Sequence, residues 1–187
     1  RVGYRMSTFV VLLRGINVGK TTRVPMADLS ELLISLGCTS VKTLLNSGNA
    51  VVKSPRSTLS GFGKRVSKVL AERFGWQIPT VIKTAESIRT IVESNPFAAE
   101  CKDASKLLIV FADSASLLST LKPEPGQVGP DEKFALTEHA GYLLCRGPIL
   151  DSVAGKALLS RTGQRITTRN WATVQKICSV LELPEFQ

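Results

Sequence analysis

The sequence has 187 residues, of which 43% are hydrophobic, and a formal net charge of +9. This length suits one ordinary domain or two small ones, and the hydrophobic share excludes a disordered chain. No apolar run approaches the roughly 18 residues of a membrane-spanning helix, and we do not expect the N-terminal residues to form a signal peptide. We therefore expect a cytoplasmic protein without a membrane partner.

The first half is predicted to form, in chain order, a strand, a helix, two strands, a helix, a strand and a helix. The apolar residues 8–14 are typical of a central strand. A helix beginning at Pro25 or Met26 has leucines at the 3–4 spacing of a buried stripe, and Gly37 ends it. The other elements are expected at 41–45, 50–53, 57–74, 79–83 and 85–93, with a hairpin turn at 46–49.

The same order recurs in the second half, although the two halves share little residue identity. Strands are expected at 106–112, 134–137, 142–146 and 165–167. Helices are expected from Asp113 or Ser114 to 121, from Ser152 to Arg161 with Gly163 as the stop, and over 169–181. Because βαββαβ is a ferredoxin-like order, we predict an α+β protein with two ferredoxin-like subdomains side by side, spanning 8–95 and 105–187. Each is expected to have an antiparallel sheet with packed helices.

The segment FVVLLRGINVGKTTRVPM, residues 9–26, resembles a nucleotide-binding P-loop. A P-loop needs four residues between its two glycines and a helix that begins at its Lys-Ser/Thr end. Here only three residues separate Gly15 from Gly19, and Pro25 delays the helix by about five residues beyond Lys20. We therefore interpret this segment as a crossover from strand to helix and not as a P-loop.

The cysteines and the single histidine argue against a metal centre. Cys38, Cys101, Cys145 and Cys178 form no C-x-x-C pair, so we predict free thiols, no metal and no cofactor. All of these except Cys101 lie in apolar patterns and are expected to be buried. His139 is expected at a hairpin tip, which is more typical of an exposed residue than of a general acid or base.

Four segments carry a resemblance to a known family: LLRGINVGKTTRVPMADL, LLNSGNAVV, NPF and TTRNWATVQKI. Together they resemble an uncharacterised bacterial family, domain of unknown function 1697 (DUF1697), over residues 8–183. The resemblance implies two side-by-side ferredoxin-like subdomains, and it implies no activity, cofactor or catalytic residue. The sequence departs from the family pattern at Lys20, Asn46 and Ala172, where the family usually has Gly, Gln and Asn. The change at Ala172 weakens any site at the last helix.

Two segments are candidate ligand-binding sites. The first is the long loop after the first strand, with Arg14, Gly15, Asn17, Gly19, Lys20 and Arg23. It can surround an anion with backbone N–H groups and positive side chains, or it can be a structural crossover in which Asn17 binds backbone. The second is the expected start of the last helix, with Thr168, Arg169 and Asn170. These residues can bind an anion, or Thr168 can cap the helix while Arg169 pairs with a carboxylate.

The hairpin residues Asn46, Ser47 and Asn49 are possible secondary contacts, although their composition is that of an ordinary turn. We expect this hairpin at the opposite end of the sheet from the C-terminus of the first strand. A site shared by the two motifs would then need the second subdomain as a bridge. Whether Arg14 and Arg169 share one site is left open.

The basic balance favours an anionic small molecule or nucleic acid as the partner, unless the basic residues only solvate exposed faces. Base stacking on the sheet is not expected, because the two central strands offer only Phe9 as an aromatic. One alternative is a small-molecule enzyme with a pocket between the subdomains. Another is a non-catalytic scaffold whose loops serve only folding.

Overall fold

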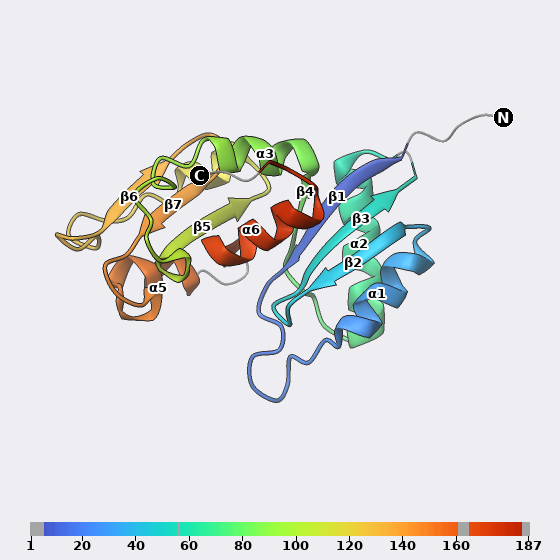
Figure 1. Cartoon of the computed structure of the whole chain (residues 1–187). Helices are drawn as coiled ribbons and strands as arrows, with labels where there is room; N and C mark the ends of the chain where they lie inside the picture. The colour runs from blue at the N-terminus through green and yellow to red at the C-terminus, as the bar shows by residue number, and fades with distance from the viewer. Residues whose placement is uncertain (1–5, 56, 161–164, 185–187) are drawn as a thin grey trace. The chain divides into compact units, whose positions relative to one another are not determined.

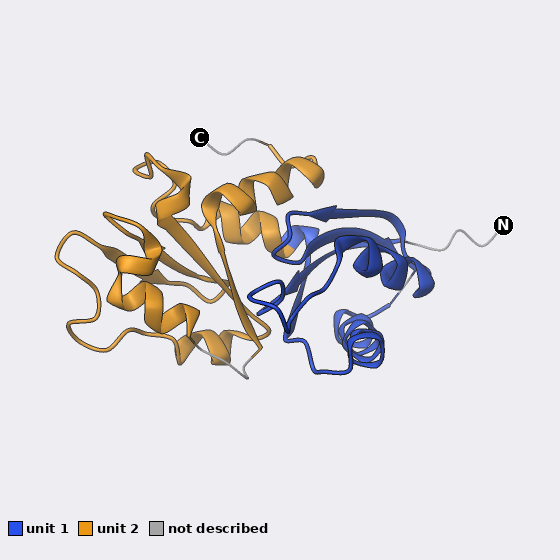
Figure 2. Cartoon of the chain, turned by 90° about the horizontal axis from the view of Figure 1, so that it is seen from below, with its two compact units in different colours: residues 1–86 blue, residues 87–187 orange. Residues whose placement is uncertain are grey.

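The computed structural model describes residues 6–55, 57–160 and 165–184. The chain divides into two compact units, residues 1–86 and residues 87–187 (Figure 2). The expected helix end at Arg161 and its stop at Gly163 lie outside the described residues, as do residues 1–5.

The first unit contains one four-stranded antiparallel sheet with the order β2-β3-β1-β4 (Figure 1). Its elements are β1 (Ser7–Leu13), α1 (Met26–Ser35), β2 (Thr39–Leu44), β3 (Asn49–Ser54), α2 (Leu59–Phe74) and β4 (Thr80–Thr84). Helix α3 (Ala85–Glu93) follows directly and spans the division between the units. Order and pairing confirm the predicted ferredoxin-like arrangement.

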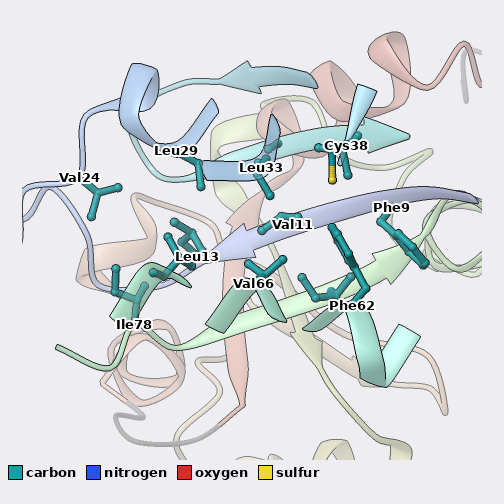
Figure 3. Packing of buried hydrophobic residues seen from close by; sticks show 14 of the residues in the cluster. Phe9, Val11, Leu13, Val24, Leu29, Leu33, Cys38, Phe62, Val66 and Ile78 are labelled. Atoms are coloured by element: carbon teal, nitrogen blue, oxygen red, sulfur yellow. The ribbon is translucent and has the colours of Figure 1, made fainter. Parts of the chain in front are cut away.

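The core of the first unit lies between the sheet and helices α1 and α2. Residues alternate across a strand, so Phe9, Val11 and Leu13 share the face that the helices cover (Figure 3). Against them pack Leu29 and Leu33 of α1 and Phe62, Val66 and Leu70 of α2. The rings of Phe9 and Phe62 stack with their centroids 4.7 Å apart. Every residue of β1 from 9 to 13 is buried, which confirms the predicted central strand.

The helix ends follow the expected chemistry at most positions. Gly37, at φ +82°, donates to the carbonyl of Ile34, and Cys38 donates to that of Leu33, which together form a Schellman motif. Gly75 ends α2 in the left-handed conformation. Pro25 was expected within the first helical turn, but it is the N-cap residue of α1, with ψ 138°.

The second unit repeats this topology in a sheet with the order β6-β7-β5-β8 (Figure 1). Its strands are β5 (Leu107–Ala112), β6 (Lys133–Leu136), β7 (Gly141–Leu144) and β8 (Ile166–Asn170). Its helices are α4 (Ala115–Ser119), α5 (Val153–Leu159) and α6 (Trp171–Val180), with short 3-10 turns at Ala104–Lys106 and Ile149–Asp151. Ser114 and Ser152 cap α4 and α5 as expected.

Helices cover both faces of the second sheet. Leu108, Val110 and Ala112 of β5 pack with Leu118 of α4 and Leu158 of α5. Helix α6 contacts β5 and β8, and its apolar stripe is buried. On β7, the buried Tyr142 donates a hydrogen bond of 2.6 Å to the carbonyl of Ile91 in α3. This bond joins α3 to the second sheet.

The boundary between β8 and α6 differs from the prediction. The strand was expected to end at Thr167 and the helix to begin at Arg169, whereas β8 continues to Asn170 and α6 begins at Trp171. The N-cap is Asn170, whose side chain accepts from the N–H of Thr173, and Thr168 is a strand residue paired with Val110. The pairing with β5 continues through Asn170, and this ladder satisfies backbone groups that an earlier helix start would leave open.

Candidate functional site

The crossover loop, residues 14–25, joins β1 to α1 and closes on itself through hydrogen bonds. The N–H of Asn17 donates to the carbonyl of Thr22 at 2.8 Å. The Thr22 hydroxyl accepts from the N–H of Val18 at 3.1 Å and donates to the Val18 carbonyl at 2.8 Å. Gly15 and Gly19 have φ of +68° and +71°, values that glycine adopts without a steric penalty. These turns give the loop a defined shape.

The side chain of Asn17 organises the loop. Its Oδ1 accepts from the N–H of Val24 at 2.9 Å, and its Nδ2 donates to the Val24 carbonyl at 3.0 Å. The same Nδ2 donates to the carbonyl of Asn46, 29 residues further along, at 2.6 Å. Asn17 itself has φ +54°, which Asn tolerates better than most residues. The structure thus gives Asn17 the backbone-binding role that we considered as an alternative to ligand contact.

The hairpin between β2 and β3 lies at the C-terminal end of β1, so the expectation that it lies at the opposite end is wrong. β3 runs antiparallel to β1 with Asn49 opposite Leu12, and the N–H of Leu13 donates to the carbonyl of Gly48 at 2.8 Å. Since β2 pairs antiparallel with β3, β2 is parallel to β1 and ends where β1 ends. The loop and the hairpin therefore meet within the first unit, and no bridge is needed.

An open pocket of about 460 Å³ lies where the crossover loop meets the hairpin. We call it the loop pocket, and it is lined by Asn17, Gly19, Lys20, Arg23, Val24, Pro25 and Asn46. Lys20 and Arg23 are exposed, and among the described residues neither side chain has a hydrogen bond or an ion pair. The lining includes two cations and no acidic residue, so its potential favours an anion.

Helix α1 begins at the edge of the loop pocket. Pro25 lines the pocket and is the N-cap of α1, and it provides no side-chain cap. The first N–H groups of a helix have no partner inside the helix, and the first helical bond here runs from Leu29 to the carbonyl of Pro25. Sequence reasoning missed this part of the site. The signal was a helix start without Ser, Thr, Asp or Asn at the cap.

Arg14 takes a different position from the other basic residues of the loop. It is half-buried, and it does not belong to the lining of the loop pocket. Burial lowers the pKa of its guanidinium from the usual value. Its backbone N–H donates to the carbonyl of Pro79, which precedes β4. Arg14 thus lies where the loop leaves β1, next to the segment that precedes β4.

The hairpin residues divide into one pocket residue and two turn residues. Asn49 is fully buried, and its Nδ2 donates to the carbonyl of Leu44 and to the hydroxyl of Ser47, both at 2.9 Å. These bonds hold the turn together. Asn46 lines the loop pocket, so it is the secondary residue that the structure brings to the predicted loop.

The second predicted segment belongs to the second unit. Arg169 is buried in β8, and its Nη1 donates to the Thr167 hydroxyl and to the Thr168 carbonyl, both at 2.8 Å. Asn170 uses its Oδ1 to accept from the N–H and the hydroxyl of Thr173. These groups already serve the strand end and the helix cap.

The cysteines and the histidine are not among the residues that line the loop pocket. Cys38, Cys145 and Cys178 are buried and unbridged, as expected. Burial raises the pKa of Cys38, and it raises those of Cys145 and Cys178 to about 11, so these thiols are poor nucleophiles. His139 is exposed in the β6–β7 turn. In the described part of the chain no His, Cys, Asp or Glu cluster is suited to a metal, and no helix has the length and apolarity to cross a membrane.

The sequence of the chain matches the model of a known protein family. The profile of the family described as "Protein of unknown function (DUF1697)" matches residues 6–142, most of the chain. The chain belongs to the DUF1697 family. The matched range includes the whole loop pocket and stops before the segment 168–170. No curated protein gives a significant match.

A solved structure supports the fold of this DUF1697 chain. The conserved bacterial protein SP0830 from Streptococcus pneumoniae superposes with a TM-score of 0.76, covering 95% of this chain and 99% of its own. The two sequences are 24% identical, so the likeness concerns the fold.

Proposed function

We propose that this protein binds an anionic ligand, carrying a phosphate or a similar oxyanion, in the loop pocket of its first unit. The observation that carries the proposal is the pair of exposed cations, Lys20 and Arg23, on an open pocket that is free of acidic lining. Each can make a charge-assisted hydrogen bond to an oxyanion, and such bonds contribute about 1.5–3 kcal/mol.

The uncapped start of α1 supports the same ligand charge. A helix N-terminus carries a partial positive charge, which stabilises a nearby anion by roughly 0.3–1 kcal/mol. Pro25 places this start at the pocket wall. This arrangement differs from a P-loop, in which the helix begins directly at the lysine. Here α1 begins after Pro25, five residues beyond Lys20 in sequence.

The predicted second contact segment supports the proposal less well. Arg169 is 8% exposed and already donates to two oxygens of its own strand, so a ligand would have to replace those bonds. We therefore assign the proposed anion site to the crossover-loop side of the loop pocket, where Lys20 and Arg23 lie.

Stacking of nucleic-acid bases on the first sheet is not part of the proposal. RNA-binding ferredoxin-like domains stack bases on exposed aromatics of the central strands. Here Phe9 is 2% exposed and stacks on Phe62 beneath the helices, so its ring cannot meet a base. A phosphate contact is the form of binding that the pocket favours.

Calorimetric titration with inorganic phosphate at low ionic strength tests the proposal. We expect saturable binding to the wild-type protein, weaker binding as salt is added, and a loss of at least about 10-fold in affinity for Lys20→Ala and for Arg23→Ala. Lys64→Ala is the matched control, because Lys64 is an exposed lysine of α2 outside the pocket. It should bind phosphate like the wild type.

Equal losses in all three variants would contradict the proposal, because binding would then reflect net charge alone. Absence of phosphate binding to the wild type, with sulfate also silent, would reject an oxyanion site. All three positions are exposed, so the variants are expected to fold, and circular dichroism checks this.

A further inference from the structure

The wall of the loop pocket formed by the hairpin differs in chemistry from the wall formed by the crossover loop. Lys20 and Arg23 come from the loop, whereas Asn46 comes from the hairpin. Among the described residues the Asn46 side chain has no hydrogen-bond partner. The backbone carbonyl of Asn46 does accept a hydrogen bond, from the side chain of Asn17. A pocket with two cations and an unengaged carboxamide presents a charged part and a neutral polar part.

We infer that the occupant is a small phosphomonoester whose neutral, hydrogen-bonding portion is recognised by the Asn46 carboxamide. This inference rests on the proposed anion site. The two cations match the charge of a phosphomonoester, and the pocket of about 460 Å³ falls within the roughly 300–1,000 Å³ typical of small organic ligands. A lone phosphate ion would leave the hairpin wall without a contact.

The carboxamide defines the chemistry of the neutral portion. Asn offers two N–H donors and a carbonyl acceptor, so it matches a hydroxyl, an amide or the edge of a base. It cannot neutralise a second anionic group as another cation would. The remaining wall, formed by Gly19, Val24 and Pro25, is uncharged. This combination suits a phosphorylated sugar, polyol or nucleoside better than a di- or triphosphate.

The same geometry disfavours a polynucleotide. Binding along a nucleic-acid backbone uses a row of cations that tracks successive phosphates. The loop pocket has two cations within one depression, and the hairpin closes one of its walls. We therefore assign the site to a single small ligand and treat nucleic acid as an outcome of the test.

Asn17 is a positioning residue for this recognition. Its Nδ2 bond to the Asn46 carbonyl fixes the hairpin backbone against the loop, while its bonds to Val24 fix the loop. The position of the Asn46 carboxamide relative to the cations therefore depends on a contact between two segments that are 29 residues apart in sequence.

The test compares inorganic phosphate with glycerol 3-phosphate, ribose 5-phosphate and AMP, using calorimetric titration of the full chain. For the wild type we expect at least one phosphomonoester to bind about 3- to 10-fold more tightly than inorganic phosphate, the gain from one or two hydrogen bonds. Asn46→Ala should remove this preference while its affinity for inorganic phosphate stays unchanged. Gln77→Ala, an exposed amide outside the pocket, should behave as the wild type.

Two results would overturn the inference while the anion site stands. In one, no phosphomonoester binds more tightly than inorganic phosphate, although Lys20→Ala and Arg23→Ala weaken phosphate binding. In the other, Asn46→Ala weakens inorganic phosphate and the phosphomonoesters equally. Tighter binding of a ten-nucleotide single-stranded RNA, with affinity kept in Asn46→Ala, would instead assign the pocket to nucleic acid. Failure of the anion site itself is distinguishable, because phosphate would then not bind at all.

Discussion

Gly48 adopts φ +86° in the hairpin, and an added Cβ would lie 2.7 Å from side-chain atoms of both Leu13 and Ile16. Its carbonyl accepts from the N–H of Leu13. The contact between the hairpin and the crossover loop therefore requires a residue that has no side chain and accepts a left-handed backbone. The sequence alone predicts the turn here, but it does not predict which side chains pack against the glycine.

Gly48→Ala is expected to destabilise the first unit strongly. The left-handed conformation costs a residue with a Cβ about 1–2 kcal/mol, and the overlap with Leu13 and Ile16 adds roughly 1–3 kcal/mol. The measurement is the free energy of unfolding in urea. Gly75→Ala separates the two causes, because Gly75 has φ +77° and nothing within 4 Å of an added Cβ. Similar losses in both variants would mean that the close packing of Gly48 has no energetic weight.

Other single residues show where sequence reasoning stops. The pattern singled out Asn17, Lys20 and Arg23 as loop residues, and the structure brings all three to one pocket. The pattern did not show that Asn17 bonds to backbone groups. That depends on which backbone groups the fold brings next to each side chain. Asn170 is the helix cap in place of Thr168, which the sequence offered for this role, since strand pairing with β5 decides how far β8 extends.

At the scale of elements, the order and type of helices and strands follow from local patterns. The stripe of leucines, the glycine stops and the continuous apolar strands predicted both βαββαβ repeats. The end of the sheet at which the hairpin lies was predicted wrongly, although the predicted order of elements is sufficient to locate it. A helix that returns from β1 makes β2 parallel to β1, and the next turn then lies at the end where β1 stops.

Helix α3 depends on a bond from the second sheet. Ile91 lies in the last turn of α3, where carbonyls have no partner within the helix, and Tyr142 donates to it. Tyr142→Phe would leave this buried carbonyl without that donor and should destabilise the second unit by about 1–3 kcal/mol. Urea unfolding and amide exchange over 85–93 measure this effect. Ser160→Ala removes an exposed hydroxyl bond and should change stability little, and an equally small effect of Tyr142→Phe would exclude the anchoring role.

At the scale of the whole molecule, buried thiols make stability depend on alkaline pH. Burial raises the pKa of Cys145 and of Cys178 from 9.0 to about 11. Between these values the unfolded chain loses thiol protons that the folded chain keeps. The stabilisation from these groups is complete below pH 9 and decreases as the pH rises through 11.

Unfolding free energies measured from pH 8 to pH 11 are therefore expected to fall for the wild type, and to fall less steeply for the double variant Cys145→Ala/Cys178→Ala. The double variant starts from a lower stability, because two buried side chains are shortened. The slope, rather than the absolute value, carries the prediction. Identical slopes would mean that the two thiols titrate alike in the folded and unfolded chain.

The closure of the crossover loop by Asn17 has a consequence for the energetics of ligand binding. A flexible loop loses conformational entropy when a ligand orders it, and this loss subtracts from affinity. In this protein three hydrogen bonds from one carboxamide already fix the loop to itself and to the hairpin. The loop thus loses this conformational entropy when the chain folds, and the pocket is preorganised before a ligand binds.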